Sequence, residues 1–290
     1  MAVKLPESVT LCLGVGAQKA GTTWLATYFA KHPAIFMSPI KELHYFDAVW
    51  LPERMGKRNQ QHLAKFKRLA GNTAFEDVAS RSAKWVEAGL HYDRLEMVAG
   101  GHDKYLEFFA KRVGDLPVAA EISPSYSLLT AENFKAIRGL HGRVKAVFLM
   151  RNPIDRVWSA LRHLERRNDK VASRFDKAIA HPGMMLRSDY GRTLDALSAG
   201  FPDEDVFVEF YENLFSEPTI RRLCDFLSIP YHPAPFGTVV NKAKERAMSP
   251  DQRQRVAALL RPVYDNCHKR FGERLPENWV AEMKYLYQDS

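Results

Sequence analysis

Short apolar runs alternate with longer amphipathic stretches along this chain. The runs at 11–15, 34–37, Val118–Ile122 and 145–150 have the length and composition of buried strands. The first run precedes a stretch that begins at Thr22 and carries apolar residues at helical spacing. Strands that alternate with helices predict an α/β fold, with a doubly wound central parallel sheet flanked by helices.

The segment 249–271 has the pattern of one long helix, with Pro262 inside it. We expect this helix to cover the sheet. The chain contains no internal repeat, low-complexity segment or interdomain linker, so we expect residues 1–290 to form a single domain.

The composition is that of an ordinary globular protein, with 46% hydrophobic and 26% charged residues. The formal net charge of +8 favours an anionic partner, but it does not choose among nucleic acid, a membrane surface, an acidic polysaccharide and a phosphorylated cofactor.

Three widely spaced cysteines predict neither a disulfide framework nor a zinc site. No apolar run approaches the ~20 residues that span a bilayer, and the first ten residues lack a secretory signal, so we expect a cytoplasmic protein.

The first apolar run ends in a glycine-bearing loop, 16–21. A strand, such a turn and a helix N-terminus direct several unpaired N–H groups at one point, which favours a bound anion. In the common nucleoside triphosphate loop, the lysine follows the last glycine and directly precedes a Ser or Thr. Here Lys19 precedes Gly21, and Thr22 and Thr23 follow it. The loop alone also fits an ordinary strand-to-helix crossover with a solvated lysine.

A second polar junction follows the run at 145–150. Arg151 comes directly after that run, Pro153 is placed to begin a helix, and Ser159 lies about two turns along it. A guanidinium fork and a hydroxyl suit a phosphate monoester.

A third cluster, 41–47, follows the run at 34–37 and contains Glu42 and His44. Ligands of open α/β sheets lie at the carboxyl ends of the strands, so we expect this cluster to lie beside the first loop. If the segment is extended, Glu42 and His44 lie on the opposite side from Leu43. The cluster also fits a solvated charged turn.

The order of these motifs resembles that of sulfotransferases that use 3′-phosphoadenosine 5′-phosphosulfate (PAPS). The loop around Lys19 resembles their 5′-phosphosulfate loop. The Arg-x-Pro start at Arg151, with a serine eight residues later, resembles their 3′-phosphate signature. The two signatures occur in the family's order, each at a predicted strand-to-helix junction, and this co-occurrence makes the resemblance specific.

Further matches extend the resemblance from about residue 10 to about residue 271. Residues 206–214 resemble a Tyr-Glu-Asp-Leu strand end, which implies that Tyr211 neighbours the adenine. Residues 241–247 resemble the late loop that closes over the 3′-phosphate, with Lys244 and Arg246 as its cations. Glu245 stands where the family has a glycine, so this loop departs from the pattern.

The cluster 41–47 resembles the Glu-x-His-Phe-Phe-Asp segment of the heparan sulfate branch, in which the glutamate is the general base. The same branch carries a basic residue after its next strand-end glutamate. This chain has Ile122 after Glu121 instead, so a heparan-type acceptor is not implied.

The resemblance implies PAPS as the donor, adenosine 3′,5′-bisphosphate as the product and no metal requirement. It implies that Lys19 stabilises the leaving group and that Glu42 takes the proton of an acceptor hydroxyl or amine, with His44 as the reserve base. The resemblance also implies that the central sheet is P-loop-like and that the acceptor is a small molecule, lipid or carbohydrate, with carbohydrate favoured. The residues implied in donor binding are Gln18, Lys19, Ala20, Gly21, Thr22, Thr23, Trp24, Arg151, Ser159, Tyr211, Lys244 and Arg246.

Two other classes of function remain open from the sequence. A P-loop kinase or NTPase is disfavoured by the displaced Lys19 and by the motif from Arg151 to Ser159. A non-catalytic binder of acidic glycan or nucleic acid predicts a surface stripe of Lys and Arg with interleaved aromatic residues. The basic residues are instead scattered over the predicted helices, so we expect no nucleic-acid partner.

Overall fold

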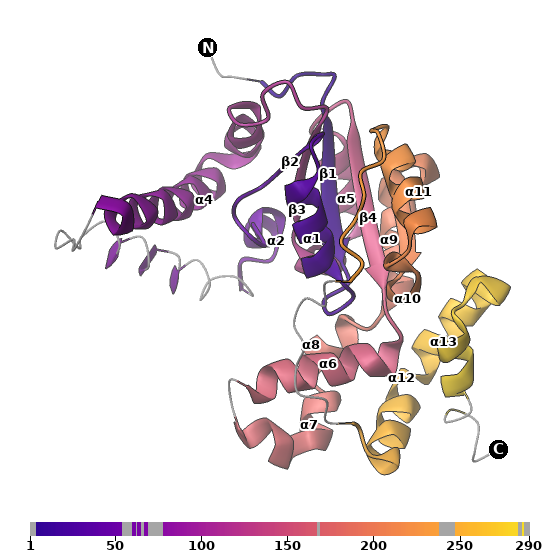
Figure 1. The fold of residues 1–290 in the computed structure, drawn as a ribbon. Helices are drawn as coiled ribbons and strands as arrows, with labels where there is room; N and C mark the ends of the chain where they lie inside the picture. The colour runs from indigo at the N-terminus through magenta and orange to yellow at the C-terminus, as the bar shows by residue number, and fades with distance from the viewer. Residues whose placement is uncertain are drawn as a thin grey trace.

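A five-stranded parallel sheet forms the centre of the computed structural model, with the strands in the order β2-β3-β1-β4-β5 (Figure 1). The structure describes residues 4–53, 60–61, 63–64, 67–68, 78–166, 169–237, 247–283 and 286. The strands are β1 Thr10–Gly16, β2 Ile35–Met37, β3 Val118–Ile122, β4 Val144–Met150 and β5 Val206–Phe210. The predicted fold class is confirmed, while the assignment of all 290 residues to one domain stays a prediction.

Helices connect and surround these strands. The longer ones are α1 Thr22–Lys31, α4 Val78–Ala110, α5 Ala131–Arg138, α6 Pro153–Glu165, α9 Tyr190–Gly200, α11 Glu217–Leu227 and α12 Pro250–Phe271. The short ones are α2 Tyr45–Trp50, α7 Phe175–Ile179, α8 Pro182–Leu186, α10 Tyr211–Leu214 and α13 Glu277–Glu282. Single 3-10 turns are η1 Pro124–Leu128, η2 Asp169–Arg174, η3 Asp203–Asp205 and η4 Gly272–Arg274.

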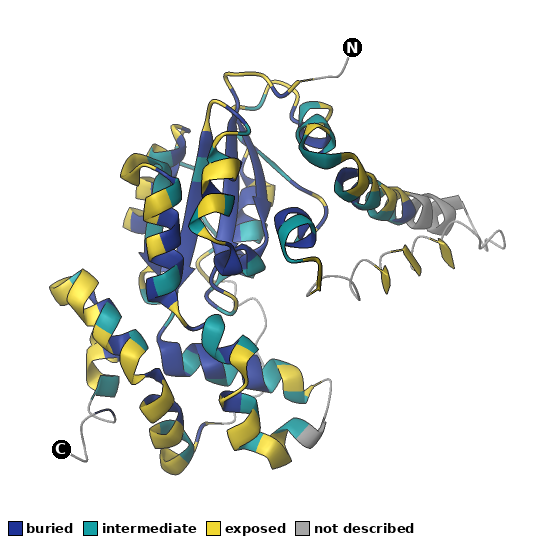
Figure 2. Cartoon of the chain, turned by 180° about the vertical axis from the view of Figure 1, so that it is seen from behind, coloured by how far each residue is buried: buried dark blue, intermediate teal, exposed yellow. Residues whose placement is uncertain are grey.

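The two faces of the sheet are covered by different helices. From β1 the chain crosses toward the β2 edge of the sheet, whereas from β3 it crosses to β4 and then to β5, toward the opposite edge. Because crossovers between parallel strands are right-handed, α1 lies on one face of the sheet, and α5 and α9 lie on the other. Figures 1 and 2 show these two layers from opposite sides. The central strands β1 and β3 are buried along their whole length, which explains why they read as continuous apolar runs.

The carboxyl ends of three neighbouring strands meet at one edge. β3 leads into η1, β1 leads into α1, and β4 leads into α6. Figure 1 shows α6, α7, α8 and α12 beyond this edge, whereas α4 projects to one side of the sheet. Three loops of the chain therefore converge at a single place.

The long C-terminal helix exists as predicted, but its predicted position was wrong. α12 packs on α6 and α9 beyond the strand ends, because the faces of the sheet are already occupied. The Tyr264 hydroxyl on α12 donates to Oδ1 of Asn152 at 2.8 Å, at the start of α6. No helix in the described part of the chain is long and apolar enough to cross a membrane.

Gly14 tests the packing between β1 and β3. A Cβ atom at Gly14 would lie 2.7 Å from Cγ1 and 2.9 Å from Cγ2 of the buried Ile122. Gly14→Ala should therefore lower the free energy of unfolding by about 1–3 kcal/mol, measured by chemical denaturation. The matched change Gly89→Ala lies on an exposed helical position with no atom within 4 Å, and it should instead stabilise by about 0.5–1 kcal/mol. A Gly14→Ala protein as stable as the parent would contradict this account of the core.

Candidate functional site

The loop between β1 and α1 forms the first part of the site. Gly21 is the N-cap of α1, with φ at 88°, and no side chain caps this helix end. The N–H groups of the first turn, at Thr22 and Thr23, have no intrahelical acceptors. Thr22 is buried and Thr23 is half-buried, so this end of α1 provides amide and hydroxyl donors with the positive end of the helix dipole.

Gly21 also permits a close approach to the segment after β5. A Cβ atom at this position would lie 2.8 Å from Cδ2 of Leu214 and 3.0 Å from Cδ2 of Tyr211. The positive φ and the contact both require glycine. Tyr211, at the start of α10, is thereby held against the first loop.

Arg151 joins the second junction to the first. β4 pairs with β1, so Arg151 emerges beside the loop, and its Nη1 lies 3.5 Å from the carbonyl oxygen of Lys19. Its guanidinium carbon lies 4.5 Å from the centre of the Tyr211 ring. The Tyr190 hydroxyl donates to the carbonyl oxygen of Arg151 at 2.7 Å and fixes the backbone there. Nε of Arg151 is buried and has no hydrogen-bond partner within the described ranges.

The other residues implied in donor binding have varied positions. Gln18 is exposed and Ala20 is buried in the same loop. Trp24 is buried among aromatic side chains, stacked on Tyr28 and Phe236 and edge-on to Phe215.

Three predicted donor residues lack a described contact with the loop. Ser159 is half-buried on α6, and no hydrogen bond of its side chain is found in the described part of the chain. Lys244 and Arg246 lie outside the described residues.

The segment before α2 forms the second wall of the site. Glu42 and His44 both have φ at 53°, in the left-handed region, so the segment is not extended and the condition considered in the sequence analysis is not met. Leu43 between them is fully buried. Two left-handed residues separated by one position still direct both polar side chains to the same place.

His44 lies between two carboxylates. Its Nε2 is 3.2 Å from Oε2 of Glu42, and its Nδ1 is 2.7 Å from Oδ2 of Asp47. Ser125, from η1, lies 2.9 Å from the same Nδ1 and donates to Oδ2 of Asp47 at 2.5 Å. Glu42 is half-buried, whereas His44 and Asp47 are buried. A histidine in this position can share a proton with Glu42 while Asp47 holds its ring in place.

A buried glutamate supports this segment from the sheet side. Glu121, at the end of β3, is fully buried and accepts hydrogen bonds from the hydroxyls of Tyr105, Ser123 and Tyr126. Burial, with a smaller contribution from the nearby charge of Asp47, raises the pKa of Glu121 to about 7, although the three hydrogen bonds act to lower it.

Lys19 lies in a strongly positive environment. Burial lowers the pKa of Lys19, and the charges of Arg166, Arg151 and Lys41 lower it further. Glu42 acts in the opposite direction and raises this pKa. Several cations thus surround one lysine, and a bound polyanion would relieve their mutual repulsion.

The structure adds residues that the sequence reasoning missed. Asp47 follows His44 by three positions at the start of a helix, and Ser125 lies just after a strand end, so both carried a local signal. Tyr190 and Arg166 come from distant parts of the chain, and neither was predicted as a site residue. Among the described residues, no group of three or more His, Cys, Asp or Glu side chains is arranged to hold a metal.

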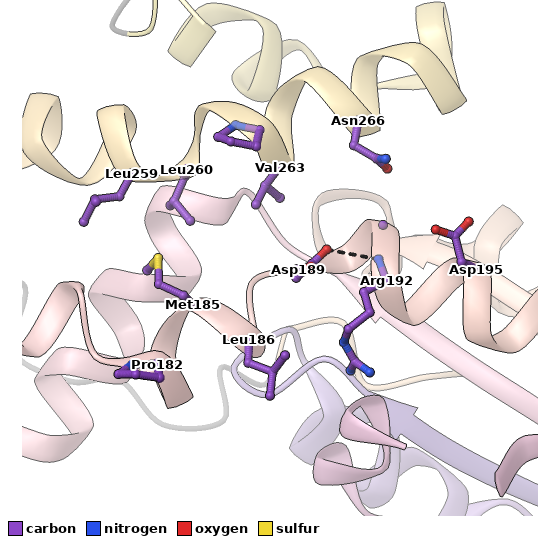
Figure 3. Close-up of a pocket in the computed structure, with 12 residues that line it drawn as sticks. Pro182, Met185, Leu186, Asp189, Arg192, Asp195, Leu259, Leu260, Val263 and Asn266 are labelled. Carbon is purple, nitrogen blue, oxygen red and sulfur yellow. Dashed lines mark hydrogen bonds between the residues drawn. The ribbon is translucent and has the colours of Figure 1, made fainter. Parts of the chain in front are cut away.

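A groove whose lining contains none of these residues lies between helices. It has a volume of about 800 Å³ and separates α12 from α8 and the start of α9 (Figure 3). Its lining is mostly apolar, with Arg192 and Asp189 on one side, and the Asp189 carboxylate accepts from the Arg192 amide. No candidate residue predicted from the sequence lines it.

Comparisons with known proteins agree with the sequence motifs. A model of the sulfotransferase family matches residues 13–233. A sulfotransferase from Alicyclobacillus acidocaldarius superposes with a TM-score of 0.60 at 21% identity, covering 93% of this chain and 98% of that one. The sulfotransferase domain from the Synechococcus PCC 7002 olefin synthase superposes with a TM-score of 0.50 at 17% identity, covering 94% and 97% of the two chains. At these identities the superpositions support the fold alone. No curated protein matches the sequence.

The charge of Lys19 should destabilise the protein in the absence of an anion. Lys19→Met should raise the unfolding temperature in a buffer without polyvalent anions, and it should reduce the stabilisation that added pyrophosphate gives the parent. Folding lowers the pKa of Lys19, so the charge of Lys19 destabilises the folded protein at neutral pH. This destabilisation is lost as the pH rises toward the ordinary lysine pKa of 10.5. The rise in unfolding temperature caused by Lys19→Met should therefore become smaller at high pH.

Lys31 provides the matched control for this change. It is exposed in the last turn of α1, where the helix dipole favours a cation, so Lys31→Met should leave the unfolding temperature unchanged or lower it. A lower unfolding temperature for Lys19→Met would contradict the electrostatic account.

Proposed function

Because this chain belongs to the sulfotransferase family, we propose that it transfers a sulfuryl group from PAPS to a hydroxyl or amine of an acceptor. The acceptor is a small molecule, lipid or carbohydrate, with carbohydrate favoured. Three buried cysteines without disulfide partners, Cys12, Cys224 and Cys267, suit a cytoplasmic enzyme.

Two strand-to-helix corners of the fold lie close together, the one between β1 and α1 and the one between β4 and α6. Their closeness supports this proposal most. Arg151 Nη1 lies 3.5 Å from the carbonyl oxygen of Lys19, although the two residues are 132 positions apart in the sequence. A single ligand with anionic groups at both ends can therefore contact both corners.

The residues at these corners fit a bisphosphorylated adenosine. The N-terminus of α1, Thr22, Thr23 and Lys19 offer donors to a 5′-phosphosulfate. Nε of Arg151, buried and without a described partner, suits a 3′-phosphate, and the nearby Tyr211 ring suits an adenine. When bound, the donor supplies the sulfuryl group and a nucleotide leaving group.

Lys19 and the first turn of α1 stabilise the charge that develops on the leaving oxygen. Their donors are fixed by the fold before the reaction, so they need little reorganisation as the charge appears. The cations around Lys19 strengthen the same field. The in-line geometry of transfer requires the acceptor to approach from the side opposite the leaving group, as in phosphoryl transfer.

Glu42 takes the acceptor proton in this proposal, and His44 governs its protonation. A protonated His44 donates Nε2–H to Glu42 and Nδ1–H to Asp47, which keeps Glu42 ionised and ready to accept a proton. His44 remains the reserve base, because its ordinary pKa lies nearer neutrality.

Ligand binding tests the proposed donor. By isothermal titration without magnesium, adenosine 3′,5′-bisphosphate should bind the parent protein more tightly than ATP does. Arg151→Met should weaken this binding by roughly 10- to 100-fold, as expected for the loss of a charge-assisted hydrogen bond. Arg143→Met, an exposed change at the opposite end of β4, should leave the affinity unchanged. Tighter binding of magnesium ATP would favour a kinase or NTPase instead.

Turnover tests the proposed base. A panel of acceptors incubated with PAPS labelled in its sulfuryl group identifies a working acceptor. With that acceptor, Glu42→Gln should lower turnover by roughly 10²- to 10⁴-fold, while the affinity for adenosine 3′,5′-bisphosphate stays constant. If Glu42→Gln kept near-normal turnover and His44→Ala abolished it, the two roles would be exchanged.

A further inference from the structure

Glu121 lies behind the proposed active site and contacts neither of its catalytic side chains. It is fully buried at the end of β3, opposite Leu13 of β1, and its two oxygens face hydroxyl groups. Tyr105 donates to Oε1 at 2.7 Å, and Ser123 donates to Oε2 at 2.9 Å. Tyr126 donates to both oxygens, at 3.0 and 3.1 Å. An ionised carboxylate can accept all of these bonds.

Two of these hydroxyls also hold the segment that carries Glu42 and His44. The oxygen of Ser123 accepts the amide of His44 at 3.0 Å. The Tyr126 oxygen accepts the amide of Tyr45 at 2.9 Å and, more weakly, that of Phe46 at 3.4 Å. Three consecutive amides of this segment thus end on two hydroxyl oxygens.

The direction of these bonds follows from the number of protons. Each hydroxyl carries one proton, and an amide N–H can only donate. Ser123 and Tyr126 can therefore accept from the segment only while their own protons point away from its amides, and Glu121 is the acceptor to which both protons point in the structure. An ionised Glu121 enforces this direction, whereas a protonated one carries a hydrogen of its own toward the same hydroxyls.

The same amides begin α2, whose N-cap has no side-chain cap. His44 is that N-cap residue, in the left-handed region, and its side chain faces Glu42 and Asp47 instead of the helix end. The hydroxyls replace the missing cap, and Glu121 fixes their orientation.

We propose that Glu121 is a positioning residue for the Glu42–His44 pair, which it orients through Ser123 and Tyr126. This inference rests on the proposed function only for the roles of Glu42 and His44. We call the hydrogen bonds from Ser123 and Tyr126 to Glu121, together with those from the amides of residues 44–46 to the same two hydroxyls, the relay. The relay can be tested without measuring turnover.

The groups that face Glu121 predict how the relay responds to pH. Tyr105 from α4, Tyr126 from η1 and Ser123 donate to it, and the Asp47 carboxylate on α2 opposes its charge. Burial raises the pKa of Glu121 to about 7, so the ionised form is lost as the pH falls below that value. The relay should therefore weaken on the acidic side of neutrality.

Hydrogen exchange of the full-length protein tests the relay directly. In Glu121→Gln the amide group donates where a carboxylate oxygen accepted, so the amides of His44, Tyr45 and Phe46 should lose roughly 10-fold or more of their protection, relative to the amides of β1. Glu209→Gln is the matched control, because Glu209 is also a buried strand-end glutamate, on β5. It should leave the protection of these three amides unchanged relative to β1.

Tyr105→Phe separates the charge of Glu121 from its packing. This change removes a hydrogen bond that lowers the pKa of Glu121 but touches neither hydroxyl that holds the segment. Protection of the three amides, corrected for intrinsic exchange, should fall with a midpoint near pH 7 in the parent and at a higher pH in Tyr105→Phe. In Glu121→Gln the protection of the three amides should be low at every pH.

The outcomes distinguish this inference from the proposed function. Glu121→Gln should keep the parent affinity for adenosine 3′,5′-bisphosphate and lose sulfuryl transfer. An even loss of protection across the protein, or a midpoint unmoved by Tyr105→Phe, would overturn the positioning role whatever reaction the enzyme performs. Selective loss at the three amides would support the relay even if no sulfuryl transfer were found.

Discussion

The gathering of like charges at one edge of the sheet is the constraint on which the site depends. Lys19, Arg151 and Arg166 come from different parts of the chain and raise one another's electrostatic free energy. The fold holds Lys19 and Arg151 there because β1 and β4 are neighbours whose carboxyl ends point the same way. This arrangement of cations lowers the stability of the protein, Glu42 offsets part of the repulsion, and a bound anion would offset more of it, as is typical of binding sites.

Acidic groups lie next to these cations, because Glu42 is close enough to raise the pKa of Lys19. Glu42 lies closest to the cations, and behind it follow His44, Asp47 and, deeper in the core, Glu121. Glu42 is half-buried, whereas Asp47 and Glu121 are buried and hydrogen-bonded. A site with cations on one wall and a hydrogen-bonded acid–base pair on the other can bind a polyanion and accept a proton from a second substrate.

The comparison between expectation and structure is informative at particular residues. The strand-to-helix junctions at Lys19 and Arg151 were predictable, because apolar runs and glycine-bearing turns are local signals. The left-handed geometry of Glu42 and His44 was not, since neither is a glycine and the hydroxyls that accept the amides of His44 and Tyr45 lie about 80 positions away. Likewise, 249–271 was identifiable as a helix, but its packing on α6 and α9 depended on which faces of the sheet were already covered.

The sequence by itself determined the α/β class, the places where strands become helices, and the family motifs at two of those places, because each depends on residues close together in the chain. The tertiary structure decided the strand order that places Arg151 beside Lys19, the hydroxyl bonds that orient Glu42 and His44, and the burial that raises the pKa of Glu121. These features depend on distances between residues far apart in sequence, and such distances exist only once the sheet has formed.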